Sequence, residues 1–272
     1  MTVDRLQAVR IVLVEPAGEL NVGSVARVMK NMGLSQLVLV KPQCNPWSDD
    51  ARQMAVHGGD ILAAAQQVET LPEALQGCQR AIATTARPRD LSTPLELPEA
   101  ALPWLLAPDT AVKPQSALIF GPEDRGLSNA ELSYAQRFMM IPAHPVYPSL
   151  NLAQAVAVCC TYLYRFANDP DRPKEAETDG SHQPLAASPV AELSPSAMAS
   201  LDNLEGYFQH LEEVLLKIGY LYPHTAKSRM EKFRRLLHRA APTEQEVALL
   251  RGTLRQLEWA LAKASLPDVP TQ

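Results

Sequence analysis

The chain has 272 residues, of which 46% are hydrophobic, so it can form a packed core and is not disordered throughout. Its 25 basic and 30 acidic side chains give a net charge of -5, so a polyanion would have to bind at local basic patches. No apolar stretch approaches the ~18 residues of a membrane span, and the four cysteines match neither a disulfide framework nor a zinc site. We therefore expect a cytoplasmic protein that binds neither a membrane nor a metal.

Short apolar runs in the first two-thirds of the chain predict strands that are buried on both faces. These runs lie at 11–14, 37–40, 81–84, 117–120 and 138–141. Helices are expected between them, at about 24–32, after 48, around 72–75 and at 129–136. Because strands and helices alternate, we predict an α/β fold in which a parallel sheet carries helices on both faces.

The composition changes after this region. Residues 168–199 contain many prolines among Asp, Glu, Ser and Ala, which is typical of a linker. Helices are expected beyond it at about 204–218, 225–241 and from Thr243, which stands at capping-box spacing from Glu246. The predicted organisation is an α/β domain at 1–167, a linker at 168–199, a helical domain at 200–265 and a tail at 266–272.

The candidate functional residues follow the strands, because open α/β sheets bind ligands at the carboxyl ends of their strands. After the first strand, Asn21 and Gly23 are expected to form a turn, with Ser24 as the cap of the next helix and Arg27 in its first turn. A cation near a helix N-terminus opposes the helix dipole, which favours a functional role for Arg27 over a surface position reached by chance.

A second loop, at 120–127, has two glycines that allow close approach of the backbone to a ligand. It matches neither the dinucleotide nor the nucleoside-triphosphate motif, and a plain turn between strand and helix is the alternative. Glu123 in this loop either accepts hydrogen bonds from the backbone of its own turn or contacts a ligand directly.

A third loop, at 141–153, contains three prolines and leads into a helix at whose start Ser149 and Asn151 stand. Capping of this helix would explain both residues without a ligand. A fourth segment follows the strand at 81–84 and contains Arg87 and Arg89, which could grip a phosphate through bidentate hydrogen bonds.

In this order, the loops resemble the SPOUT class of RNA methyltransferases, in particular the SpoU/TrmH branch. That branch has the motifs Asn-x-Gly-x-x-Ala-Arg, Phe-Gly-x-Glu-x-x-Gly-Leu and Ser-Leu-Asn-Leu-x-x-Ala-Val, which stand here at 21–27, 120–127 and 149–156. The segment 84–87 and the appended helices resemble the TrmJ group. The resemblance covers nearly the whole chain.

The resemblance implies a methyltransferase that uses S-adenosylmethionine and acts on the ribose of the first anticodon-loop nucleotide of tRNA, cytidine or uridine. It also implies a C-terminal trefoil knot in the α/β domain and a homodimer in which each site borrows groups from the partner. Arg27 corresponds to the catalytic arginine, and the cofactor-binding positions are Thr84, Thr85, Ala86, Gly121, Ile141, Ser149, Leu150 and Asn151. We add Glu123 to the expected cofactor-binding residues on the interpretation in which it contacts a ligand directly.

The reaction needs an oriented donor and assistance to a ribose hydroxyl, which is a poor nucleophile at neutral pH. A guanidinium group loses its proton only above about pH 12 and is no general base. We therefore expect Arg27 to hold the adjoining phosphate and the developing alkoxide, with Ser149 or a water molecule nearer the proton.

Seven basic side chains, Arg234 and His238 among them, lie between positions 227 and 239 against a single acidic one. The apolar residues of this helix form one face, so we expect the charges to project outward onto RNA phosphates, with a solvated helix face as the alternative. The predicted substrate-binding residues are Arg87, Arg89, Arg125, Lys232, Arg235 and Arg239.

Two other functions remain open at this point. Pro122 stands where relatives often have arginine, with Arg125 as a substitute, and Pro148 removes a backbone donor beside Ser149. These departures allow an RNA-binding protein of the same fold without catalysis. A methyltransferase acting on ribosomal RNA is the second alternative, and the helical appendage argues against it.

Overall fold

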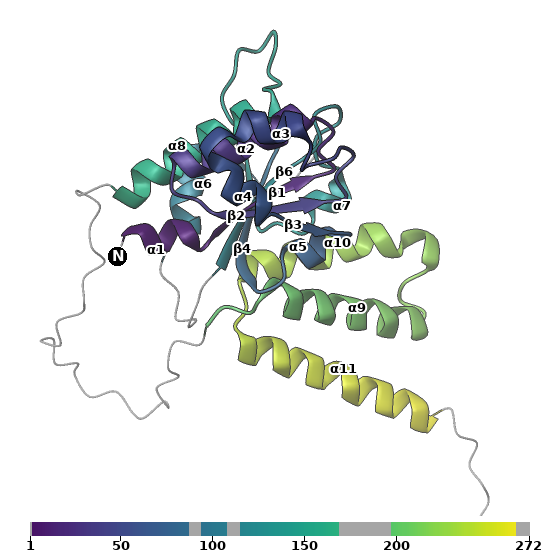
Figure 1. Cartoon of the computed structure of the whole chain (residues 1–272). Coiled ribbons are helices and arrows are strands. Elements are labelled where there is room, and N and C mark those ends of the chain that lie inside the picture. The colour runs from purple at the N-terminus through teal and green to yellow at the C-terminus, as the bar shows by residue number, and fades with distance from the viewer. Residues whose placement is uncertain (1, 87–93, 108–114, 169–196, 265–272) are drawn as a thin grey trace, which may run out of the picture.

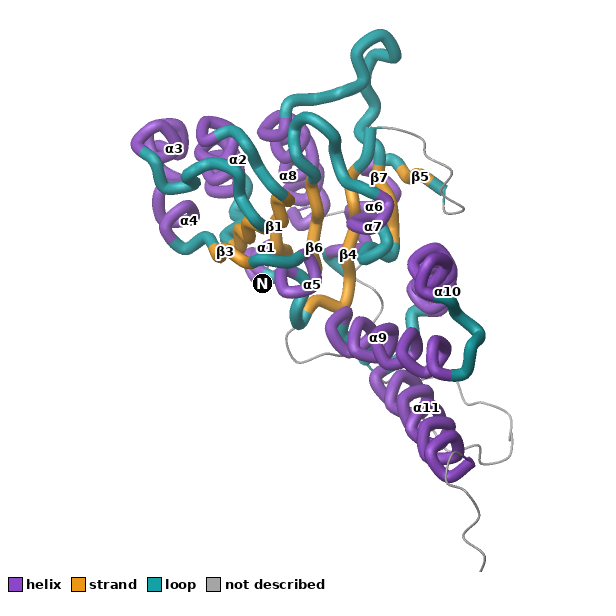
Figure 2. The backbone as a smooth tube through the Cα atoms, turned by 90° about the vertical axis from the view of Figure 1, so that its right-hand side faces the viewer, coloured by secondary structure: helices purple, strands orange, loops and turns teal. Residues whose placement is uncertain are grey.

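The computed structural model describes residues 2–86, 94–107, 115–168 and 197–264, and its centre is a seven-stranded parallel sheet (Figure 1). The strand order is β3-β2-β1-β6-β4-β7-β5. The strands are β1 (Val9–Val14), β2 (Gln36–Val40), β3 (Gln66–Val68), β4 (Cys78–Thr84), β5 (Leu95–Glu96), β6 (Gln115–Phe120) and β7 (Arg137–Met139). Because all neighbours are parallel, the loops that follow the strands gather at one edge of the sheet (Figure 2).

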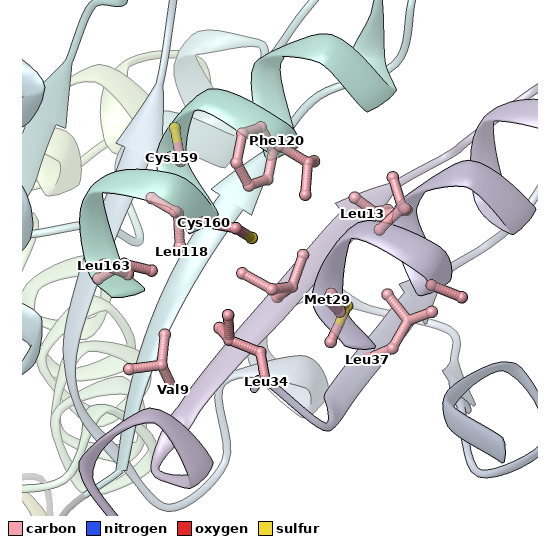
Figure 3. Packing of buried hydrophobic residues seen from close by; sticks show 14 of the residues in the cluster. Val9, Leu13, Met29, Leu34, Leu37, Leu118, Phe120, Cys159, Cys160 and Leu163 are labelled. Carbon is pink, nitrogen blue, oxygen red and sulfur yellow. The ribbon is translucent and has the colours of Figure 1, made fainter. Parts of the chain in front are cut away.

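Helices cover both faces of this sheet, and successive residues of a strand face opposite sides. Ile11 and Leu13 pack in one apolar cluster, whereas Val12 and Val14 pack in the other. Figure 3 shows the first cluster, which lies between the sheet and the helices α2 and α8. The helices are α1 (Thr2–Gln7), α2 (Glu19–Asn31), α3 (Asp49–Ala55), α4 (Gly59–Ala63), α5 (Leu71–Ala74), α6 (Pro98–Leu105), α7 (Asn129–Leu132), α8 (Leu152–Asn168), α9 (Leu201–Lys217), α10 (Pro223–Ala240) and α11 (Glu244–Ala264), with a 3-10 turn η1 (Val56–Gly58).

The second apolar cluster joins the sheet to the C-terminal helices. Phe208 of α9 belongs to the same cluster as Ala81 of β4 and Ile119 of β6. Helix α9 contacts β4 and α5, and α10 and α11 pack on α9. The helical region therefore shares a core with the sheet, and it extends from one side of the molecule in both views (Figures 1 and 2).

The α/β class and the five predicted strands are confirmed. The strand β7 ends at Met139, so Ile141 lies in the following loop. Strands β3 and β5 have no counterpart in the prediction, because three and two residues are too few to carry a periodic signal. Among the described residues, no helix is long and apolar enough to cross a membrane.

The three C-terminal helices are present as predicted. Thr243 and Glu246 form the expected capping box, in which Glu246 N–H donates to Thr243 Oγ1 at 3.3 Å and Thr243 N–H donates to Glu246 Oε2 at 2.7 Å. The predicted linker, 168–199, lies mostly outside the described residues. Its last residues pack on the helical region, where Ala199 N–H donates to the carbonyl oxygen of Pro242 at 2.9 Å.

The predicted turn at the start of α2 is wrong. This helix begins at Glu19, so Asn21, Gly23 and Ser24 are helical and Arg27 lies beyond the first turn. Gly23 serves close packing instead, because a Cβ atom there would lie 2.2 Å from the carbonyl oxygen of Ala51 in α3. A glycine that lets two helices approach has the same sequence signature as a turn glycine, and the sequence alone does not separate them.

The outward orientation predicted for all charges of α10 is also wrong for two residues. Arg234 forms a bidentate ion pair with Glu205 of α9, and its guanidinium carbon lies 4.6 Å from the ring centroid of Phe208. His238 is 8% exposed and packs edge-on against Phe208. These inward side chains attach α10 to α9. They thereby determine which faces of α10 remain accessible.

Burial makes His238 a source of acid sensitivity. Desolvation, assisted by the charge of Arg234, lowers the pKa of His238 from 6.5 to about 4. The unfolded chain therefore binds a proton near pH 6.5 that the folded chain binds only near pH 4, so stability falls as the pH drops through this window. We expect the free energy of unfolding to fall by about 2 kcal/mol between pH 7.5 and pH 5 from this group alone.

Urea unfolding of the wild type and of His238→Leu at both pH values checks this prediction. Leucine has a similar size and no charge, so the variant should lose less stability on acidification than the wild type. An identical pH dependence in the two proteins would show that His238 titrates normally in the folded state.

Candidate active site at the ends of the strands

A cavity of about 310 Å³ lies where the loops after β4, β6 and β7 meet. Its volume is within the range of small-molecule sites. The lining includes every predicted cofactor-binding residue except Asn151, namely Thr84, Thr85, Ala86, Gly121, Glu123, Ile141, Ser149 and Leu150. Segments separated by more than fifty positions in the sequence therefore form a single site.

The loop 121–127 folds tightly on itself at the wall of this cavity. A Cβ atom on Gly121 would lie 2.4 Å from the backbone nitrogen of Leu127 and 2.5 Å from the carbonyl carbon of Gly126. Gly126 has a φ of +65°, in the left-handed region that glycine favours, and its N–H donates to the Pro122 carbonyl oxygen at 3.0 Å. Both glycines are thus required for the course of the backbone.

Glu123 joins this loop to the loop after β1. Its carboxylate accepts hydrogen bonds from the backbone N–H groups of Ala17 and Gly18 at 3.1 and 3.3 Å, and from Asn21 Nδ2 at 2.7 Å. The alternative in which Glu123 binds the backbone of its own turn is wrong, because the donors belong to a segment about a hundred positions earlier in the chain. The carboxylate still borders the cavity and is exposed.

The same network reaches the third loop through Asn151, whose Nδ2 donates to Asn21 Oδ1 at 2.9 Å. Asn151 also caps α8, because its Oδ1 accepts from the N–H groups of Ala153 and Gln154 at 2.9 and 3.3 Å. The helix-capping alternative is therefore confirmed for Asn151. Asn151 does not itself line the cavity, and its amide group instead links the third loop to α2.

The segment after β4 is held by the neighbouring strands. Thr84 Oγ1 donates to the carbonyl oxygen of Ile119 in β6 at 2.9 Å, and Thr85 N–H donates to the carbonyl oxygen of Met139 in β7 at 2.9 Å. This loop therefore enters the cavity from a rigid sheet, as precise ligand positioning requires.

The two predicted catalytic residues occupy different places. Ser149 lines the cavity and is exposed at its rim. Arg27 is exposed on α2 and does not line the cavity of its own chain. Its backbone packs tightly against the η1 turn, since a Cβ atom on Gly58 would lie 2.8 Å from the Arg27 nitrogen.

The predicted substrate-binding residues are divided among three places. Arg87 and Arg89 lie outside the described residues. Arg125 lines the cavity, but its guanidinium binds Glu131 at 2.9 Å and Glu15 at 2.6 Å, and these hydrogen bonds raise its pKa above the usual value. The remaining three lie on α10 at a second cavity: Lys232, Arg235 and Arg239.

Tyr147 also lines the cavity but is absent from the sequence prediction. Its side chain is 78% exposed in the proline-containing loop before Ser149. The sequence feature that could have indicated Tyr147 is an aromatic residue in a proline-containing loop after a strand, because surface aromatic residues often contact ligands. Among the described residues, no group of three or more His, Cys, Asp or Glu side chains could hold a metal ion.

Comparison with known proteins assigns this site to a class. The model of the SpoU rRNA Methylase family matches residues 8–161, and the chain belongs to this family. Residues 202–267 match the model of the C-terminal domain of the tRNA methyltransferase TrmJ. The resemblance predicted from the motifs is therefore confirmed, and so is its TrmJ-type extension.

Individual relatives are similar to this chain over nearly its full length. The tRNA (cytidine/uridine-2'-O-)-methyltransferase TrmJ of Pectobacterium atrosepticum is 40% identical over 253 residues, which is 93% of this chain and 98% of the relative. The tRNA (cytidine/uridine/adenosine-2'-O-)-methyltransferase TrmJ of Pseudomonas aeruginosa is 39% identical over 93% of this chain and 95% of its own. The crystal structure of TrmJ from Z. mobilis ZM4 has a TM-score of 0.75 at 29% identity and covers 92% of this chain and 98% of that chain.

Proposed function

We propose that this protein transfers a methyl group from S-adenosylmethionine to a ribose 2′-hydroxyl of tRNA, at a cytidine or uridine that is the first nucleotide of the anticodon loop. The observation that carries the proposal is the convergence of the segments 84–86, 121–127 and 141–150 on one cavity. Full-length similarity to tRNA 2′-O-methyltransferases supports the substrate class.

The residues of the cavity fit the cofactor. Leu127, Leu152 and Ile141 offer an apolar surface to a purine ring, and the glycine-containing loop brings backbone donors and acceptors close to a ligand. When bound, S-adenosylmethionine supplies a methyl group attached to a sulfonium centre, and the rest of the cofactor is the leaving group as a neutral thioether. The protein then has to orient donor and acceptor, which can contribute on the order of 7 to 11 kcal/mol to lowering the barrier.

Arg27 would act on the cavity of a second protomer. Its exposed position away from its own cavity supports a homodimer in which the α2 helix of one chain faces the cavity of the other. There its guanidinium holds the phosphate next to the target nucleotide and stabilises the alkoxide that forms as the hydroxyl loses its proton. Ser149, exposed at the rim, or a water molecule beside it accepts a hydrogen bond from the ribose hydroxyl and relays its proton to bulk solvent.

Arg125 was expected to substitute for the arginine that relatives often have where this chain has Pro122. Two carboxylates already bind the Arg125 guanidinium, so it stabilises the loop rather than replacing an arginine at position 122. Phosphate contacts near the reaction then come from Arg27 and from Arg87 and Arg89.

The proposal includes features of the whole protein that accompany this activity. The four free cysteines support a cytoplasmic location. A trefoil knot in the α/β domain would fix the two cofactor loops at 121–127 and 141–151 relative to each other. The domains are proposed to be 1–167 and 200–265, joined by the linker 168–199.

Glu123→Gln is expected to weaken cofactor binding without unfolding the protein. The new amide keeps one acceptor oxygen, which can still accept from Gly18 and Asn21, but it places its NH2 donor against the N–H group of Ala17, so the connection between the segments 17–21 and 121–127 is weakened. We expect the dissociation constant of S-adenosylhomocysteine to rise about threefold to tenfold in calorimetry. Glu69→Gln, at an exposed site outside the cavity, is the control, and equal affinities of the two variants would contradict the role of the network.

Methyl transfer itself tests the proposed function. Purified tRNA and purified ribosomal RNA are incubated separately with the protein and S-adenosylmethionine labelled on the methyl group, and the labelled nucleosides are then identified by mass spectrometry. We expect 2′-O-methylcytidine or 2′-O-methyluridine from tRNA alone. Label in ribosomal RNA alone would reassign the substrate, and binding of both ligands without transfer would show a non-catalytic RNA-binding protein.

A further inference from the structure

A second cavity, a cleft of about 890 Å³, lies between α10 and the edge of the sheet. One wall is α10, with Lys232, Arg235 and Arg239, and the other is formed by the β5–α6 and β7 segments, with Trp104 and Arg137. We call this cavity the α10 cleft. It joins two parts of the chain that are far apart in sequence.

The charge of the α10 cleft is strongly positive. Its single acidic lining residue, Glu96, is already neutralised, because its Oε1 lies 2.9 Å from Arg137 Nε. Lys232 and Arg239 are exposed and have no ion-pair partner among the described residues. In a chain with a net charge of -5, this concentration of cations provides a local site for a polyanion.

The cations of the cleft are arranged in a fixed row. Positions 232, 235 and 239 have the spacing i, i+3, i+7 and lie along one side of the helix over roughly 10 Å. The inward contacts of Arg234 and His238 set the rotation of α10 that turns this row toward the sheet. The row is therefore built into the packing of the helical region on its neighbours.

Strand β7 connects the α10 cleft to the candidate active site. Arg137 and Phe138 line the cleft, and Ile141, shortly after the same strand, lines the cofactor cavity. An extended chain of four residues spans about 13 Å. A polyanion bound in the cleft thus lies within a few nucleotides of the reaction.

We propose that the α10 cleft binds the phosphodiester backbone of the RNA substrate a few nucleotides from the target ribose, with the cations of α10 on one side and the sheet edge on the other. This inference rests on the proposed function and deepens it. It predicts that only the row of α10 that faces the cleft contacts RNA, whereas Lys227, an exposed cation of the same helix outside the cleft, does not.

The salt dependence of tRNA binding tests this proposal. Affinity of full-length tRNA is measured by fluorescence anisotropy over a series of salt concentrations, with S-adenosylhomocysteine present, for the wild type, Lys232→Ala/Arg239→Ala and Lys227→Ala. Each lost phosphate contact lowers the slope of log affinity against log salt by about 0.7 to 0.9. We therefore expect the double variant to lose roughly 1.5 in slope, and Lys227→Ala to keep the wild-type slope.

Unchanged thermal unfolding and S-adenosylhomocysteine affinity would show that the variants are folded. The proposal is overturned if the double variant keeps the wild-type slope, if Lys227→Ala loses as much slope, or if the wild type does not bind tRNA. Because no catalysis occurs in this measurement, its result is independent of methyl transfer. A protein that binds tRNA through the cleft but transfers no methyl group would contradict the proposed function alone.

Discussion

Arg27→Ala is expected to reduce the turnover number of methyl transfer by about 10²-fold to 10³-fold while the affinity for S-adenosylhomocysteine stays unchanged. Arg27 does not line the cofactor cavity of its own chain, so its loss leaves that cavity intact. In the proposed mechanism its charge stabilises the developing alkoxide only in the transition state, which is why turnover rather than cofactor binding should fall.

Arg27→Lys separates the charge of the side chain from its forked geometry. Lysine keeps the charge but cannot bind a phosphate through two parallel hydrogen bonds, so we expect at least a tenfold loss of turnover, roughly 1.4 kcal/mol. Arg52→Lys is the matched control, because Arg52 is an exposed arginine on α3, outside the cavity. Full turnover in Arg27→Lys would show that the bidentate part of the proposed role is wrong.

A mixed dimer tests whether Arg27 acts across the proposed homodimer. Arg27→Ala and Gly121→Ala chains are co-expressed with different tags, and the mixed species is purified. If Arg27 acts on the partner, the mixed species has one complete site and regains about half of the wild-type activity per dimer. If Arg27 acts within its own chain, neither site is complete, and at a cofactor concentration well below the dissociation constant of the Gly121→Ala site the mixed dimer shows only the residual activity of the two single variants.

Gly121→Ala should have the second large effect, on cofactor binding. The new Cβ atom would lie 2.4 Å from the Leu127 nitrogen and 2.9 Å from the Gly126 Cα atom, and backbone atoms cannot move aside as a flexible side chain can. We expect the loop 121–127 to shift and the dissociation constant of S-adenosylhomocysteine to rise more than about tenfold. The free energy of unfolding of Gly121→Ala should also be about 1 to 3 kcal/mol lower than that of the wild type, as at other overpacked sites.

Gly59→Ala is the control for Gly121→Ala. Gly59 has helical backbone angles at the start of α4, and nothing lies within 4 Å of a Cβ atom built there. Alanine should therefore leave cofactor affinity unchanged and leave stability equal or slightly higher. Wild-type affinity in Gly121→Ala, measured by calorimetry, would contradict the assignment of the loop 121–127 to the cofactor site.

The sequence could predict the sheet and its functional edge because both have strong local signals. Continuous apolar runs such as Ile11–Val14 occur in strands buried on both faces, and the motif residues follow these strands directly. The parallel arrangement then brings the loops together, since all strands end at the same edge. Local patterns and strand order therefore predict that these loops lie together at the ligand-binding edge, whereas the assignment of Thr84, Gly121 and Leu150 to a cofactor was implied by the resemblance to the SpoU/TrmH branch.

Features that depend on distant partners could not be predicted in this way. Gly23 packs against Ala51 of another helix, and Arg234 turns inward because Glu205 and Phe208 lie on the facing side of α9. Nothing close to either residue in the sequence indicates these contacts. The same applies to Glu123, whose donors lie in a loop about a hundred positions away.

A crystal structure of the protein with S-adenosylhomocysteine tests the central claim most directly. We expect the adenosyl group between the segments 84–86 and 141–150, against the loop 121–127, and the guanidinium of Arg27 from a second chain opposite the sulfur atom. An adenosyl group bound elsewhere, or a cofactor cavity that no second chain approaches, would contradict the account.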